Sequence, residues 1–245
     1  MKNLKKLVIC LTLACAMAIV LSGSVTASAI PNPYVTSVDP ANGAVNVPVN
    51  TVINVTFNKP IQSGSSYEDI TVKNGAGTEK VISKSITDKV LTITTKPNYN
   101  FGDTYTLYIP VNAVTDSYDN GFVSEYTSTF TTQKMPDLTP TNINVPDTVN
   151  VNTITPVTVT VSNIGTADAG QFTVKVYDGT KAILWQTITN LAAGTDTTFT
   201  FNWKPTTLVT HTLKIVTDYN NQITESNENN NQLTKDISVQ PGIFS

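Results

Sequence analysis

Short segments in which apolar and polar residues alternate recur along the chain after residue 30, and this alternation predicts β-strands. In segment 51–58, Ile53, Val55 and Phe57 occupy one face, while asparagine and threonine occupy the other. The same alternation recurs in three later segments, 104–109, 156–162 and 198–203. Threonine on the outer face suits a pleated surface in contact with water. No helical periodicity competes with this pattern, so we expect an all-β chain.

Turn-forming residues separate the predicted strands at intervals typical of β-sandwiches, for example at 39–43 and 119–121. The pattern breaks near Pro136, which keeps the backbone extended. Each half is about 100 residues long, the usual size of such a sandwich. We therefore expect two tandem immunoglobulin-like β-sandwiches, at 33–132 and 137–240, with a linker at 133–136 and a tail at 241–245.

The first 29 residues are typical of a secretory signal peptide. A lysine-containing start precedes an apolar run at 7–21, and the small residues Ala27, Ser28 and Ala29 form a cleavage site. The apolar run is shorter than the roughly 20 residues that span a membrane. We expect the 1–29 helix to be removed, which leaves a secreted or cell-surface-associated chain with no membrane insertion after cleavage. An uncleaved membrane anchor is the alternative.

The composition excludes several classes of function. Both cysteines, Cys10 and Cys15, lie in the predicted signal peptide, so the mature chain has no disulfide and no thiolate ligand. The chain has 15 Lys plus Arg against 18 Asp plus Glu, and none of the 15 is arginine. Removal of the signal peptide removes three lysines and makes the chain more acidic. Such a chain lacks the basic surface that phosphate neutralisation needs, so nucleic acid is not an expected partner.

The first half carries several motifs in an ordered series: 38–49 (VDPANGAVNVPV), 53–61 (INVTFNKPI), 102–105 (GDTY) and the closing 130–132 (FTT). In these motifs it resembles the bacterial Ig-like domain known from S-layer proteins. The resemblance implies a β-sandwich over nearly all of 33–132. One departure lies at 116–121 (DSYDNG), where the family often has an Asp-x-x-Gly-Asn loop.

The second half opens with Asp137–Leu138, continues with 157–165 (VTVTVSNIG), and ends with 211–218 (HTLKIVTD) and the Asn-rich 220–231 (NNQITESNENNN). These motifs resemble the cell-adhesion-related domain found in bacteria and archaea, CARDB. The resemblance implies a second β-sandwich, and it implies surface attachment or a spacer role within exported proteins.

Candidate catalytic residues are few. The single histidine, His211, shares a strand face with Leu213 and Ile215, which favours a structural role. One histidine does not supply a histidine-rich zinc cluster, and no serine lies in a nucleophile-elbow pattern. Glu225 and Glu228 share one loop, but among 18 acidic residues some such pair is expected by chance. We therefore assign no catalytic, cofactor-binding or metal-binding residue and expect that the protein is not an enzyme.

Calcium is an open alternative at two loops, 218–228 and 116–121, because Ca²⁺ takes six to eight oxygen ligands and these loops are rich in Asp, Asn and Glu. Neither loop has EF-hand spacing. Asn and Asp also cap turns by bonding to the local backbone, and that is our main interpretation. In the second loop we expect Asn227 and Asn230 to tie two loop strands together. No cofactor is expected on this interpretation.

Aromatic side chains raise a carbohydrate-binding alternative, since exposed rings stack on sugar faces. Trp203 continues a Phe-x-Phe face and Trp185 alternates with Ile183, so we expect both tryptophans to be buried. The tyrosines on loops or outward positions are better candidates, namely Tyr118, Tyr177 and Tyr219, but their sequence positions are scattered.

These observations favour a non-catalytic exported protein with a structural or adhesive role at the cell surface. The alternative is a glycan-binding accessory protein of the cell envelope. The partner expected on either interpretation is a cell-envelope glycan or a surface protein.

Overall fold

The computed structural model describes residues 31–242. The signal peptide predicted at 1–29, with Cys10 and Cys15, lies outside the described residues, as do the last three residues of the predicted tail. The described chain is built from strands and one short 3-10 helix, Tyr67–Asp69. The all-β prediction is confirmed over this range. Within it, no helix has the length and hydropathy needed to cross a bilayer.

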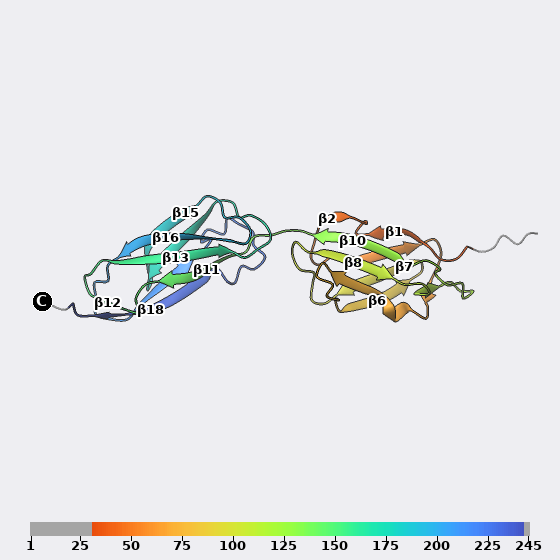
Figure 1. The fold of residues 1–245 in the computed structure, drawn as a ribbon, viewed down its shortest axis with the longest axis horizontal. Coiled ribbons are helices and arrows are strands. Elements are labelled where there is room, and N and C mark those ends of the chain that lie inside the picture. Colours follow the sequence, from red (N-terminus) through yellow and green to blue (C-terminus); the bar gives the residue numbers. More distant parts are fainter. Residues whose placement is uncertain (1–30, 243–245) are drawn as a thin grey trace, which may run out of the picture. The chain divides into compact units, whose positions relative to one another are not determined.

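The first sandwich consists of two four-stranded sheets and a two-stranded ribbon (Figure 1). The sheet orders are β1-β3-β7-β6 and β2-β10-β8-β5, and the ribbon is β4-β9. The strands are β1 (Val35–Asp39), β2 (Ala44–Val47), β3 (Ile53–Phe57), β4 (Gln62–Ser63), β5 (Thr71–Asn74), β6 (Ile82–Thr87), β7 (Val90–Thr95), β8 (Thr104–Ile109), β9 (Val114–Thr115) and β10 (Tyr126–Thr132).

The second sandwich consists of a three-stranded sheet, β11-β13-β16, and a five-stranded sheet, β12-β18-β17-β14-β15 (Figure 1). The strands are β11 (Leu138–Asn144), β12 (Thr148–Asn150), β13 (Thr155–Asn163), β14 (Phe172–Asp178), β15 (Lys181–Ile188), β16 (Thr195–Trp203), β17 (His211–Val216) and β18 (Gln232–Gln240).

Both sandwiches divide their first strand between the two sheets. In the first, β1 pairs antiparallel with β3, and the chain then crosses to pair β2 parallel with the last strand, β10. In the second, β11 pairs with β13, and β12 runs parallel to the last strand, β18. Pro40 and Pro146 lie between the two strand halves. Because proline has no N–H to donate to a ladder, each proline ends the first pairing where the chain changes sheets.

The alternating residues form the two cores. Val55 and Leu107 come from opposite sheets of the first sandwich, and each is at most 1% exposed. Val159 and Leu213 likewise come from opposite sheets of the second sandwich, and both are fully buried. Burial of apolar surface stabilises the folded state by about 25 cal/mol per Å². The period-two pattern therefore predicted the core face of these strands correctly.

Asparagine and aspartate shape the turns. In the described chain every non-glycine residue with positive φ is Asn or Asp, namely Asn46, Asp88, Asn112, Asp119, Asn152, Asp218 and Asn221. These two side chains tolerate the left-handed region better than other residues with a Cβ. Much of the asparagine in this sequence thus has a backbone role.

Truncation of one core leucine in each sandwich tests this account. Leu107→Ala and Leu213→Ala are each expected to lower the free energy of unfolding by about 2–5 kcal/mol, because each leaves a cavity. Urea unfolding followed by circular dichroism measures both variants, and tryptophan fluorescence adds a probe of the half that holds Trp185 and Trp203. The control is Val81→Ala at a side chain that is 74% exposed, with an expected change within about 0.5 kcal/mol. Equal effects of the core and control variants would contradict the assigned cores.

Candidate functional site

The Asn-rich loop between β17 and β18 is fastened to the start of β11. The backbone N–H of Leu138 donates to Glu225 Oε2, and Ser226 Oγ donates to Asp137 Oδ2 at 3.0 Å. Asn230 Nδ2 donates to Asp137 Oδ1 at 2.7 Å. The two motifs that opened and closed the second half of the sequence are therefore in direct contact.

Most polar groups of this loop bond to the protein itself. Asp218 is 4% exposed and accepts the backbone N–H groups of Gln222 and Ile223 at 3.0 and 2.8 Å. Asn227 Oδ1 accepts the N–H of Asn229 at 3.1 Å. These contacts are the turn-capping bonds expected from sequence. Asn227 bonds locally, whereas Asn230 ties the loop to Asp137, the residue just before β11.

Glu225 is the most perturbed carboxyl of the loop. Glu225 is only 6% exposed, and this burial raises the pKa of its carboxyl from 4.5 to about 7. Hydrogen bonds from Leu138 N–H and Asn231 Nδ2 lower the pKa, and the nearby carboxylates of Glu228 and Asp218 raise it again. The carboxyl is therefore held where a proton or a cation would offset its buried charge.

The loop contains some, but not all, of the oxygen ligands that a hard cation such as Ca²⁺ needs. No group of three or more His, Cys, Asp or Glu residues with metal-binding geometry occurs among residues 31–242. Two buried amide oxygens, Asn230 Oδ1 and Asn231 Oδ1, have no hydrogen-bond partner in the described chain. An unpaired buried acceptor is costly. The amide nitrogens of the same two side chains donate to carboxylates, Asn230 Nδ2 to Asp137 and Asn231 Nδ2 to Glu225. Carboxyl and amide oxygens together are ligands that Ca²⁺ accepts.

The perturbed pKa predicts a pH-dependent stability. Glu225 binds a proton more tightly in the folded than in the unfolded chain, so its contribution to stability is full below pH 4.5 and is lost as the pH rises through about 7. Glu225→Gln keeps the shape without the charge, and a flipped Asn231 amide would accept its new N–H₂. The variant is expected to match the wild type near pH 4 and to exceed it by about 2 kcal/mol at pH 8.

Urea unfolding at a series of pH values measures this difference. Glu79→Gln, at an exposed residue in the first sandwich, is the matched control and should follow the wild type at every pH. A Glu225→Gln difference that stays constant across the series would contradict a raised pKa.

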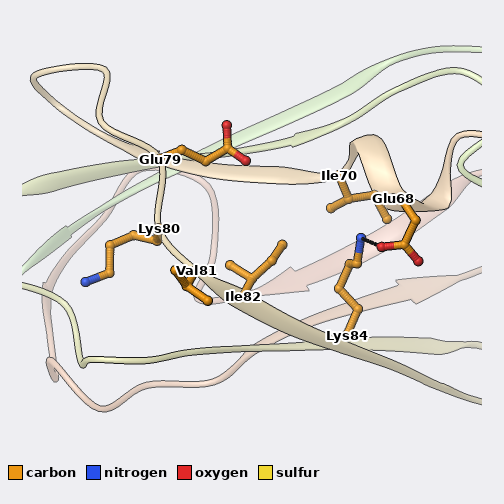
Figure 2. A pocket seen from close by; sticks show the side chains of 7 residues that line it. All are labelled: Glu68, Ile70, Glu79, Lys80, Val81, Ile82 and Lys84. Atoms are coloured by element: carbon orange, nitrogen blue, oxygen red, sulfur yellow. Dashed lines mark hydrogen bonds and ion pairs between the residues drawn. The ribbon is translucent and has the colours of Figure 1, made fainter.

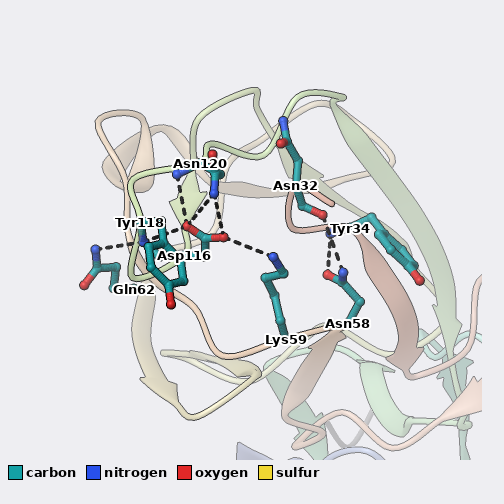
Figure 3. A network of polar contacts seen from close by, with 8 residues as sticks. All are labelled: Asn32, Tyr34, Asn58, Lys59, Gln62, Asp116, Tyr118 and Asn120. Carbon is teal, nitrogen blue, oxygen red and sulfur yellow. Dashed lines mark hydrogen bonds and ion pairs between the residues drawn. The ribbon is translucent and has the colours of Figure 1, made fainter. Parts of the chain in front are cut away.

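The second calcium alternative, the loop 116–121, is closed by a lysine (Figure 3). Asp116 is 3% exposed, and its Oδ2 lies 3.0 Å from Lys59 Nζ. The backbone N–H groups of Tyr118 and Asn120 donate to Oδ1 at 2.9 and 3.0 Å. The hydrogen bond from the Asn120 side chain, those backbone donors and Lys59 together hold the pKa of Asp116 well below its usual range. The Lys59 ammonium lies where a calcium ion would have to bind Asp116, so the Asp and Asn side chains of this loop cap its turn.

His211 has a closer set of partners than its sequence indicated. Its Nδ1 lies 2.7 Å from Asp178 Oδ1, and its Nε2 lies 3.0 Å from Thr207 Oγ1. The indole N–H of Trp203 donates to Asp178 Oδ2 at 3.1 Å. The order hydroxyl–imidazole–carboxylate has the form of a catalytic triad. Sequence offered no signal for it, because the three residues are separated along the chain and the hydroxyl is a threonine.

The geometry of this set favours a clamp rather than a catalyst. Known threonine nucleophiles are activated by an N-terminal amine, which the internal Thr207 lacks. Asp178 divides its hydrogen bonds between His211 and Trp203, so the set fastens the turn after β16 to β14 and β17. A hollow of about 250 Å³ lies beside Asp178 and Trp203, but neither Thr207 nor His211 lines it.

The first sandwich has a surface hollow of about 360 Å³ (Figure 2). Lys84, which lines this hollow, has a side chain that is 8% exposed. Its Nζ is paired with Glu68 Oε2 at 2.9 Å and donates to the Tyr67 carbonyl at 2.7 Å. Figure 2 shows Glu79 and Lys80 directed away from each other at the other end. The Lys84 ammonium in this hollow is therefore already paired, and the polar side chains that line the hollow do not point toward a common ligand position.

The two tryptophans have opposite environments. Trp203 is 3% exposed, as predicted, but Trp185 is 60% exposed, so its predicted burial is wrong. The reason is a β-bulge: the β14–β15 register shifts so that Ile183 has no partner of its own, while Leu184 pairs with Val176. Ile183 and Leu184 both pack toward the core, and Trp185 turns to the outer face.

The structure also brings together two of the three candidate tyrosines. The rings of Tyr177 and Tyr219 lie 6.4 Å apart in the second sandwich. Tyr118 belongs to the first sandwich and is 71% exposed. The separation in sequence therefore concealed a pair that the tertiary fold creates.

Comparisons with known proteins agree with this division of the chain. The CARDB family model matches residues 135–235, and a model described as bacterial Ig-like domain matches residues 30–132. A search of curated proteins found no match.

Three solved structures illustrate the likeness. A CARDB domain from Pyrococcus furiosus, crystallised in complex with di-metal ions, is 35% identical, with 43% of this chain and 90% of that chain covered and a TM-score of 0.41. A domain of a putative cell surface protein from Methanosarcina acetivorans is 33% identical, with 43% and 93% covered and a TM-score of 0.40. The N-terminal part of the bacterial S-layer protein SbsC is 16% identical, with 86% and 44% covered and a TM-score of 0.32.

Two tandem sandwiches, each with a first strand divided between its sheets, define a multidomain protein of the immunoglobulin-like class. The chain belongs to the CARDB family through residues 135–235, and residues 30–132 match the bacterial Ig-like domain model. The resemblance to CARDB is confirmed, and the resemblance of the first half is confirmed as far as the bacterial Ig-like domain. These domain types indicate a cell-surface or extracellular protein with a structural or adhesive role.

Proposed function

We propose that the protein is exported through its first 29 residues and acts, without catalysis, as a structural and adhesive module of the cell envelope. The observation that carries the proposal is the pairing of a bacterial Ig-like domain with a CARDB domain along almost the whole described chain. The motif at 38–49 further supports an S-layer type for the first domain. The clamp role of His211 supports the absence of catalysis, and the proposed partner is a cell-envelope glycan or surface protein.

Fractionation of cells that produce the full chain with a C-terminal tag tests export and retention. The protein is expected in the envelope fraction or the medium, with a mature N-terminus at Ile30 by intact-mass analysis. Ala27→Glu together with Ala29→Glu is expected to block cleavage, because the site requires small residues. Thr26→Ala beside the site is the control and should be processed normally.

Two outcomes would overturn this proposal. A wild-type protein that remains in the cytosolic fraction with residues 1–29 attached would remove export. Turnover of an ester substrate that disappears in His211→Ala, with the fold intact, would remove the non-catalytic role.

A second candidate function is the binding of a structural Ca²⁺ ion by the Asn-rich loop, and the two unpartnered oxygens of Asn230 and Asn231 favour it. Calcium is expected to raise the melting temperature of the protein, and to do so more at pH 8 than at pH 5, because the Glu225 carboxyl must lose its proton to bind a cation. Differential scanning calorimetry with calcium or with chelator measures the effect. Asn231→Ala should reduce the shift, whereas Asn120→Ala in the lysine-closed loop should leave it unchanged. No shift at either pH would overturn this candidate.

A further inference from the structure

The five-stranded sheet of the second sandwich carries a cluster of aromatic and basic side chains on its outer face. We call it the aromatic–lysine patch, and it consists of Lys175 and Tyr177 on β14, Trp185 on β15, Lys214 on β17 and Tyr219 in the turn after β17. The ladder places Lys175 opposite Trp185 and Tyr177 opposite Lys214. The members therefore come from three neighbouring strands and one turn, on the side away from the core.

Lys175 is the centre of the patch. Its Nζ lies 3.9 Å from the ring centroid of Tyr219, 5.0 Å from that of Trp185 and 5.3 Å from that of Tyr177. Lys214 Nζ lies 4.6 Å from the Tyr177 ring. At these distances an ammonium is attracted to the face of an aromatic ring. The five side chains thus form one connected surface.

Two of the three rings in the patch are largely exposed to solvent. Trp185 is 60% exposed and Tyr219 is 44% exposed. Exposed tryptophan leaves a large apolar area in water, and such groups mark interaction sites when they cluster. The β-bulge at Ile183 directs Trp185 outward while its neighbours fill the core.

The charge of the patch is opposite to that of the chain. The whole chain has a formal net charge of −3, yet the ion pairs found among residues 31–242 involve neither Lys175 nor Lys214. Desolvation acts to lower the pKa of Lys175, but contacts with Tyr177 and Tyr219 outweigh it and raise the pKa. The acidic residue on the neighbouring strand, Asp236 on β18, accepts a hydrogen bond from the Thr212 hydroxyl at 2.6 Å and forms no ion pair with either lysine. Two ammonium groups are therefore available to an anionic ligand.

We propose that the aromatic–lysine patch binds an acidic polysaccharide, with sugar rings stacked on Trp185 and Tyr219 and sugar carboxylates paired with Lys175 and Lys214. The electron-rich face of an aromatic ring attracts the C–H bonds of a pyranose, and the lysines supply the complementary charge. A uronic-acid polymer presents both features in every repeat. This inference deepens the adhesive part of the proposed function and rests on it.

Titration of the mature chain with a galacturonate hexamer tests the proposal. Because Trp203 is buried and Trp185 is exposed, ligand stacking is expected to change the emission of Trp185 and to protect it from a soluble quencher. Trp185→Ala and the double variant Lys175→Gln/Lys214→Gln are each expected to weaken binding about tenfold, measured by calorimetry. Binding of the wild type should also weaken as salt is added.

Matched controls lie in the first sandwich. Tyr118→Ala removes an aromatic side chain that is 71% exposed, and Lys89→Gln removes an exposed lysine, so neither should change the affinity. Circular dichroism confirms that each variant is folded.

Three results would overturn the inference: no binding of the galacturonate hexamer, equal binding of a neutral cellulose hexamer, or full affinity in the folded patch variants. Retention in the envelope fraction is measured separately. If retention persists while hexamer binding is absent, the patch inference fails and the proposed function stands. If the protein is not exported at all, the proposed function fails whatever the hexamer result.

Discussion

Burial of every second side chain between two facing sheets is the interaction on which both halves of this protein depend. Val55 and Val159 show it in the two sandwiches, since each sits on a central strand and is fully buried. No cysteine occurs in the described range, so no disulfide assists the cores. A pleated strand that buries one face must expose the other, and the outer faces are therefore where these domains present side chains to other molecules.

The aromatic–lysine patch depends on a local exception to that period of two. Without the bulge at Ile183, Trp185 would pair with the buried Val174 on the inward face, and Leu184 would face outward. One additional residue in β15 reverses the direction of the side chains that follow it. The bulge thus links the packing of the core to the chemistry of the surface.

The Asn-rich loop stabilises the second sandwich in a different way. Glu225 and Asp137 join the segment before β18 to the first strand through hydrogen bonds between residues about 90 positions apart. Burial of a carboxyl is costly, and the raised pKa of Glu225 reflects that cost. The same arrangement leaves two amide oxygens without partners, which is the reason a cation is a candidate ligand here and not at Asp116, where Lys59 already supplies the positive charge.

The sequence by itself determined the β class, the core face of the strands such as those of Ile53 and Val159, and the two domain families, because these depend on local periodicity and short motifs. It also indicated that Asp and Asn serve the turns, since their backbone preferences are intrinsic. Only the tertiary structure decided that Trp185 faces outward, that Tyr177 and Tyr219 meet around Lys175, and that Thr207 and Asp178 flank His211. These contacts join residues distant in sequence, and their formation depends on strand register and bulge position, which alternation along a single strand does not specify.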